Sequence, residues 1–108
     1  MTNIRNMPMT EEVALTDLVS VKDHQVVSRT ITKGDTVSIV LLAFSEGESV
    51  SEEKYYSDVL YLVIEGEAVI TLGGTAKTIH ENRAAAVPAG VLHGISGNGS
   101  FKIMQILL

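Results

Sequence analysis

The chain has 108 residues, enough for one domain with a hydrophobic core and too few for two. Hydrophobic residues make up 45% and charged residues 19%, as in globular proteins, and no apolar run approaches the roughly 20 residues that cross a bilayer. The formal charge of −5, with no lysine or arginine cluster, argues against nucleic acid or a membrane surface as a partner, and the absence of cysteine excludes disulfides and thiolate sites.

Residues 1–22 are expected to form an N-terminal arm that is weakly ordered. Pro8 interrupts any helix there, and the apolar positions between Val13 and Val21 fit neither a helix face nor a strand, so one helical turn is the most we expect. The segment lacks the basic start and continuous apolar stretch of a secretory signal. A cytoplasmic location is therefore expected.

Residues 23–108 carry the pattern of an all-β domain. Two β-branched runs, 25–32 and 36–44, flank a hairpin signal at Lys33-Gly34-Asp35, and a loop is expected over 44–54. The longest apolar series, Val59 to Ile64, predicts a central strand. Short runs between Gly-rich turns follow it, and this pattern is typical of a sandwich or barrel.

Two of these runs, 37–44 and 59–64, are apolar on both faces. An antiparallel sheet commonly exposes one face to water, so a second covering surface is needed. A homodimer interface is the simplest candidate for that surface.

Two spaced motifs identify a family. Gly47 and Gly66 enclose Glu53, Tyr55 and Val59 in the spacing G-x5-H-x-H-x3-E-x6-G. A second frame, G-x5-P-x-G-x2-H-x3-N, is occupied by Asn82, Pro88, Gly90, His93 and Gly97. The chain therefore resembles the cupins, and the resemblance covers about half its length. It implies a single-domain cupin jelly-roll barrel, a double-stranded β-helix of the RmlC-like type.

Metal-binding cupins hold Mn, Fe, Ni or Zn with three histidines and one glutamate at motif positions that are here Glu53, Tyr55, Val59 and His93. Only His93 keeps the family residue. Valine offers no donor atom, and a neutral tyrosine is a poor ligand. The resemblance thus implies the barrel together with a weakened or lost metal site.

Each candidate residue has a plainer alternative. His93 either lines a functional pocket or is a hydrogen-bonded core residue, and Glu53 either faces inward or belongs to a solvated loop. Asp58 is a substitute ligand only if a bulge reverses its strand face. Tyr55 shares the inward parity with Tyr61, for which core packing is the alternative.

Three functional hypotheses remain open. The first is a small-molecule-binding barrel with a pocket around Glu53, Tyr55, Val59, Tyr61 and His93. The second is a divergent metal-dependent enzyme, resembling a dioxygenase, isomerase or decarboxylase, that uses Glu53, His93 and Asp58 as ligands. The third is a sensor or assembly partner that works through its apolar surface. His24 and His80 lie in or beside turns and are expected to face solvent.

Overall fold

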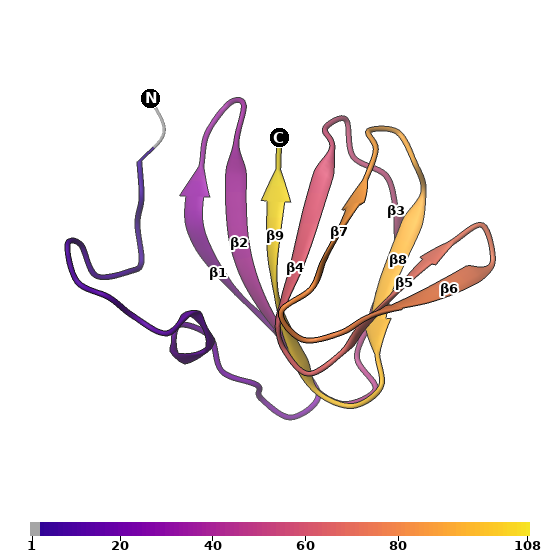
Figure 1. Cartoon of the computed structure of the whole chain (residues 1–108), viewed down its shortest axis with the longest axis horizontal. Helices are drawn as coiled ribbons and strands as arrows, with labels where there is room; N and C mark the ends of the chain where they lie inside the picture. Colours follow the sequence, from indigo (N-terminus) through magenta and orange to yellow (C-terminus); the bar gives the residue numbers. More distant parts are fainter. Residues whose placement is uncertain (1–2) are drawn as a thin grey trace.

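The computed structural model describes residues 3–108 as two antiparallel sheets that face each other (Figure 1). The larger sheet has the strand order β1-β2-β9-β4-β7, and the smaller has the order β3-β8-β5-β6. The strands are β1 (Val26–Lys33), β2 (Ser38–Phe44), β3 (Val50–Glu53), β4 (Val59–Glu65), β5 (Ala68–Leu72), β6 (Thr75–Ile79), β7 (Ala84–Val87), β8 (His93–Gly97) and β9 (Phe101–Leu107). The predicted all-β jelly roll is confirmed.

The hairpin predicted around Gly34 joins β1 to β2, and the backbone N–H of Gly34 donates to the carbonyl of Val37. Two other expectations are wrong in detail. The expected loop over 44–54 ends in β3, a short strand with mostly exposed side chains that pairs with β8. The middle strand of the larger sheet is β9, with β4 beside it, because the partners of a strand come from distant parts of the chain.

The main core lies between the two sheets. Along β4 the side chains of Val59, Tyr61 and Val63 face inward and are almost completely buried, while the residues between them are only partly buried. This is the alternation expected of a pleated strand. At one end of the core, the rings of Phe44 and Phe101 stack with centroids 4.4 Å apart.

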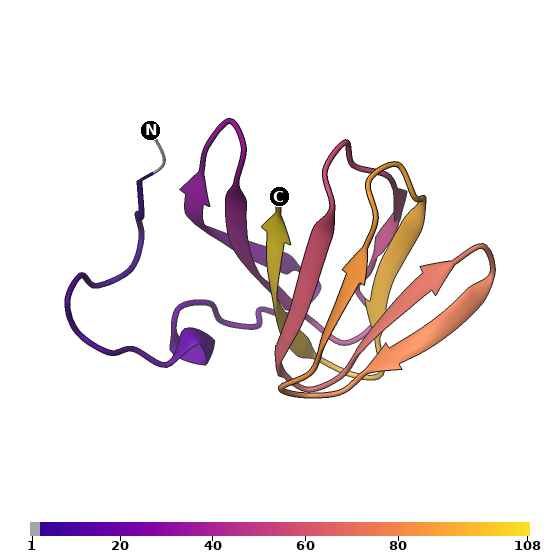
Figure 2. The ribbon, with the colours of Figure 1, turned by 45° about the horizontal axis from the view of Figure 1, so that its top comes forward.

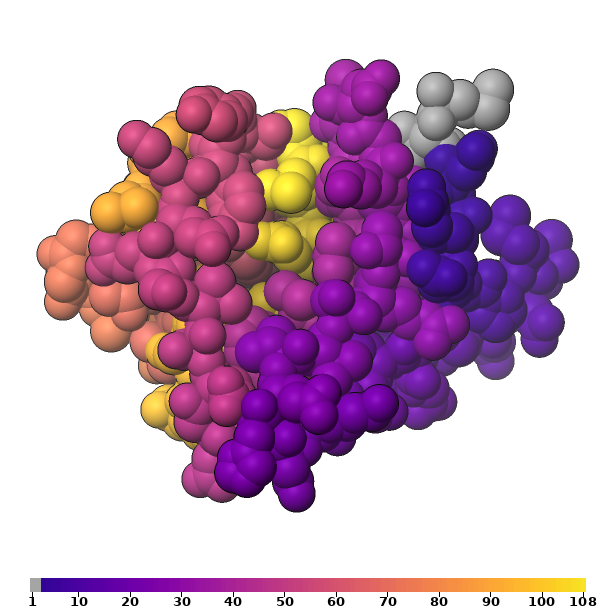
Figure 3. Space-filling view, turned by 180° about the vertical axis from the view of Figure 1, so that it is seen from behind, coloured from indigo at the N-terminus to yellow at the C-terminus, as the bar shows by residue number. Residues whose placement is uncertain are grey.

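A second core covers the outer face of the larger sheet. Leu18 and Val19 of the N-terminal segment are buried against Ile31, Leu41 and Ala43, and the last two are fully shielded from solvent. Figure 2 shows this segment running beside β1, and Figure 3 shows it from behind in indigo against the purple atoms of the first hairpin. The outer face of β2, for which the sequence required a cover, is covered by the chain itself.

Cationic side chains hold the N-terminal segment on the sheet. Arg29 donates to the carbonyl oxygens of Asn6 and Leu18, at 2.6 and 3.1 Å. Lys102 donates to the carbonyl of Thr16 at 2.8 Å, beside the 3-10 turn η1 (Leu15–Asp17). The one helical turn that we expected is therefore present. In residues 3–108, no helix is long and apolar enough to cross a membrane.

Candidate functional site

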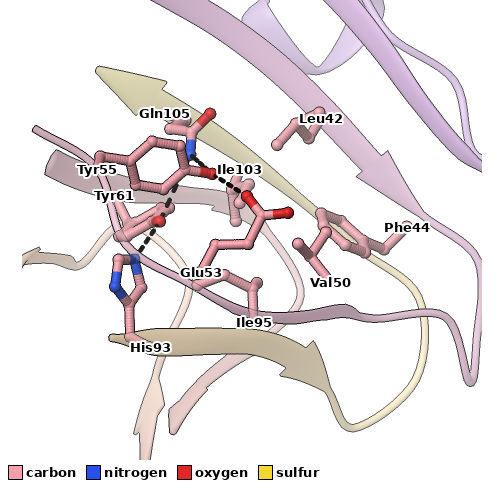
Figure 4. Close-up of a pocket in the computed structure, with 10 residues that line it drawn as sticks. All are labelled: Leu42, Phe44, Val50, Glu53, Tyr55, Tyr61, His93, Ile95, Ile103 and Gln105. Atoms are coloured by element: carbon pink, nitrogen blue, oxygen red, sulfur yellow. Dashed lines mark hydrogen bonds between the residues drawn. The ribbon is translucent and has the colours of Figure 1, made fainter. Parts of the chain in front are cut away.

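A cavity of about 200 Å³ lies between the two sheets (Figure 4). Its polar residues gather at one side, and its remaining wall is apolar. The lining residues are Leu42, Phe44, Val50, Glu53, Tyr55, Tyr61, His93, Ile95, Ile103 and Gln105. The cavity is smaller than the roughly 300 to 1,000 Å³ of pockets for drug-sized ligands.

Strand pairing brings the polar residues together. Glu53 at the end of β3 is the cross-strand partner of His93 at the start of β8. On the opposite sheet, Tyr61 of β4 pairs with Gln105 of β9. Tyr55 lies in the loop between the sheets, where its carbonyl accepts from the N–H of Gly90. Each sheet thus contributes a neighbouring pair, and Tyr55 joins them.

The polar side chains form one hydrogen-bonded chain (Figure 4). The hydroxyl of Tyr61 lies 2.6 Å from His93 Nε2, and the hydroxyl of Tyr55 donates to Glu53 Oε2 at 3.1 Å. Gln105 Nε2 lies 3.4 Å from both phenol oxygens and donates to each. His93 Nδ1 lies 2.9 Å from the carbonyl of Val91.

The hydrogen-bond partners of His93 and the two tyrosines indicate which of their atoms carry a proton. Because a carbonyl can only accept, His93 carries a proton on Nδ1 and donates it to Val91. Burial raises the pKa of Tyr61 to about 12 and also raises the pKa of Tyr55, so both phenols are protonated at neutral pH. In the neutral imidazole, a proton on Nδ1 leaves Nε2 as an acceptor, so the hydroxyl of Tyr61 donates to His93 Nε2 and occupies its lone pair.

Comparison with known proteins decides the family. A cupin superfamily protein from Desulfitobacterium hafniense is 40% identical, with 98% of this chain and 97% of that chain covered at a TM-score of 0.94. The chain belongs to the cupin superfamily. A conserved protein of unknown function from Streptococcus pyogenes, 21% identical, has the same fold over 100% of this cupin and 95% of that chain, also at a TM-score of 0.94. No family model matches the chain.

This chain is also similar in sequence to a short part of one enzyme. This cupin is 27% identical over 74 residues to a mannose-1-phosphate guanylyltransferase from Salmonella montevideo. The matched segment is 68% of this chain and 16% of the enzyme. The chain thus spans about one sixth of that enzyme's length.

Backbone conformation explains which residues occupy two turn positions of the cupin motifs. Gly66 has φ of 75°, and a Cβ there would lie 2.7 Å from the carbonyl oxygen of Ser100. Asn82 replaces the first glycine of the second motif and has φ of 64°, a conformation that asparagine adopts more readily than most residues. These turn positions are set by backbone geometry, whichever residues stand between them.

Four of the five predicted pocket residues, Glu53, Tyr55, Tyr61 and His93, line the cavity of this cupin. Glu53 is solvent-exposed, as a loop residue would be, and its side chain also points into the cavity toward Tyr55 (Figure 4). Val59 is 1% exposed and packs in the main core instead of lining the cavity.

Asp58 lies away from the cavity. It precedes β4, and its carboxylate accepts from the backbone N–H of Ala89 at 2.8 Å, beside a surface depression formed with Ala86, Val87 and Pro88. The condition for an inward Asp58, a bulge that reverses its strand face, is therefore not met, and its carboxylate instead binds the turn after β7. His24 and His80 are exposed, as expected.

The donor set does not fit a metal ion. Within residues 3–108, no group of three or more His, Asp or Glu side chains is placed to hold one. Of the two good donors at the cavity, His93 has its Nε2 lone pair engaged by Tyr61. A metal at this nitrogen would have to break that bond and would then find only Glu53 as a second strong ligand.

Gln105 is the polar cavity residue that the sequence does not reveal. It belongs to no motif, and β9 shows only partial strand periodicity. Its position follows from the pairing of β9 with β4, which places it opposite Tyr61. A polar residue on the otherwise apolar inward face of the strand, between Ile103 and Leu107, is the one signal that points to it.

Proposed function

We propose that this cupin binds a small molecule in the cavity between its sheets and does so without a metal ion. The observation that carries the proposal is the set of polar groups that converge on one side of a small apolar cavity. This is the general form of a small-ligand site, where apolar walls supply binding energy and a few polar groups orient the ligand. An engineered apolar cavity of about 150 Å³ admits benzene, so a ligand of that size class fits here.

Metal analysis tests the first half of the proposal. Protein purified without chelator should contain far less than one equivalent of Mn, Fe, Ni or Zn, and titration with each ion should show only weak binding. Stoichiometric metal that disappears in His93→Ala would contradict the proposal and favour the metal-dependent enzyme instead.

Ligand-observed NMR with a library of neutral, anionic and cationic fragments tests the second half. We expect saturable binding that is lost when Val50→Phe fills part of the cavity. Val69→Phe is the matched control, because Val69 lies in the same sheet and does not line the cavity. If no fragment binds, or if Val50→Phe binds as the unaltered protein does, the cavity is not a ligand site.

We also propose that the protein is a homodimer. The N-terminal segment covers part of the larger sheet, but on its outer face Leu60, Leu62 and Ile106 remain only partly buried. Leu60 is the cross-strand neighbour of Ile106 on one side and of Ala86, on the edge strand β7, on the other. One apolar surface at an edge strand is suited to pairing with its own copy about a two-fold axis.

A further inference from the structure

The charges around the cavity restrict the ligand. Among the ten lining residues, Glu53 is the acidic one, and none is a lysine or arginine. The whole chain carries a formal charge of −5, which gives no attraction for an anion at longer range. A carboxylate or phosphate in this cavity would lose water and meet a like charge without a cation to offset it.

The hydrogen bonds among the cavity side chains also disfavour an anionic ligand. Both phenol protons are engaged, one with Glu53 and one with His93, and Gln105 Nε2 donates to both phenol oxygens. The Nδ1 proton of His93 is engaged with Val91. The side-chain donors of the cavity are therefore used within the protein.

Acceptors, by contrast, remain available. Within residues 3–108, no donor contacts the second carboxylate oxygen of Glu53, which Figure 4 shows directed into the cavity. The side-chain oxygen of Gln105 is likewise without a donor from the described chain. A ligand that satisfies this site must supply protons, and an ammonium group supplies three.

Aromatic rings line the same cavity as the acceptor oxygens of Glu53 and Gln105. Phe44, Tyr55 and Tyr61 all line the cavity, and the face of an aromatic ring attracts a cation within about 6 Å. Burial is the main reason that the pKa values of Tyr55 and Tyr61 are raised, and the negative charge of Glu53 adds to both increases. The negative charge of Glu53 thus acts at both hydroxyls, and a cation bound beside them would be attracted by it.

We propose that the ligand of this cavity is a small primary amine, bound as its ammonium ion between Glu53 and the tyrosine rings, with its hydrocarbon part against the apolar wall. This inference rests on the proposed function, namely that the cavity binds a small molecule. It adds the chemical class of that molecule. The apolar wall formed by residues such as Leu42, Val50 and Ile95 favours a compact hydrocarbon group over a polyhydroxylated one.

Isothermal titration with three probes of one shape tests the inference: benzylamine, benzyl alcohol and benzoate, at pH 7 and low salt. We expect benzylamine to bind at least about tenfold more tightly than benzyl alcohol, because an ionic hydrogen bond is about twice as strong as a neutral one, and benzoate to bind most weakly. Added salt should weaken only the binding of benzylamine.

Glu53→Gln removes the charge and keeps the shape, so it should bring the affinity for benzylamine down to that for benzyl alcohol. Glu52→Gln is the matched control, because Glu52 lies next in sequence outside the cavity, and it should leave all three affinities unchanged.

The outcomes separate the two proposals. If benzyl alcohol or benzoate binds as tightly as benzylamine, or if Glu53→Gln has no effect, the amine inference is overturned while the cavity remains a ligand site. If none of the three binds but other library fragments do, the inference is also overturned. If nothing in the library binds, the proposed function fails as well.

Discussion

The hydroxyl of Tyr61 connects the two polar pairs of the cavity. Tyr61 lies two residues after Val59 on β4, so its side chain faces the same inward side, and the residue is 2% exposed. The sequence offered core packing or pocket lining as alternatives for this residue, and the structure shows that both hold. The ring belongs to the main core, and the oxygen reaches His93 and Gln105 at the cavity.

The raised pKa of Tyr61 predicts a loss of stability at high pH. The value is about 12 in the folded protein against 10.0 ordinarily, so the folded state holds this proton more tightly than the unfolded state. The stabilisation is fully present below pH 10 and should be lost as the pH rises from about 10 to about 12, by about 2 kcal/mol. Urea unfolding at a series of pH values measures it.

Tyr61→Phe isolates this contribution. The variant should be less stable at pH 7, because His93 loses its hydrogen bond, and should show a smaller fall between pH 10 and 12, to which Tyr55 still contributes. Tyr56→Phe is the control, since Tyr56 is 99% exposed, and it should behave as the unaltered protein. Equal losses in Tyr61→Phe and the unaltered protein would contradict the prediction.

Among the elements, β8 shows how closely the sheets approach. Its last residue, Gly97, stands where the second cupin motif has asparagine, and a Cβ there would overlap Cδ1 and Cε1 of Phe101. Because the ring of Phe101 is stacked on Phe44, it has little freedom to move aside. Glycine in place of the motif asparagine therefore avoids a clash with Phe101, which the motif spacing alone does not show.

Gly97→Ala should destabilise the protein by about 1 to 3 kcal/mol through overpacking, measured as a shift in the urea midpoint. Gly94→Ala, in the same strand, is the matched control. The nearest atom to its new Cβ is the carbonyl oxygen of Val50 at 3.4 Å, so we expect a change within about 0.5 kcal/mol. Equal effects of the two substitutions would show that Phe101 yields to the new methyl group.

At the scale of the whole molecule, the N-terminal segment changes the argument for a dimer. The sequence calls for a cover on the outer faces of both 37–44 and 59–64. Leu18 and Val19 supply it for β2, and the outer face of β4 retains the partly buried Leu60 and Leu62. Any dimer interface is therefore expected over β4, β9 and β7, away from β1 and the first hairpin.

Leu60→Glu should convert the dimer to a monomer at micromolar concentration in sedimentation velocity, because a charge would be buried without a partner. Thr78→Glu, on the exposed strand β6 of the other sheet, should leave the dimer intact. An unaltered protein that is already monomeric at this concentration would contradict the proposed homodimer.

The sequence pattern by itself determined the all-β class, and the resemblance to the cupin motifs added the jelly-roll frame and four of the residues that line the cavity. It did so because turn glycines, strand alternation and motif spacing are local properties of the chain. Only the tertiary structure decided that β3 pairs with β8, that Gln105 faces Tyr61, that the Asp58 carboxylate binds the turn after β7 and that Leu18 and Val19 cover the sheet. Each of these depends on contacts between segments far apart in sequence, and no local pattern specifies them.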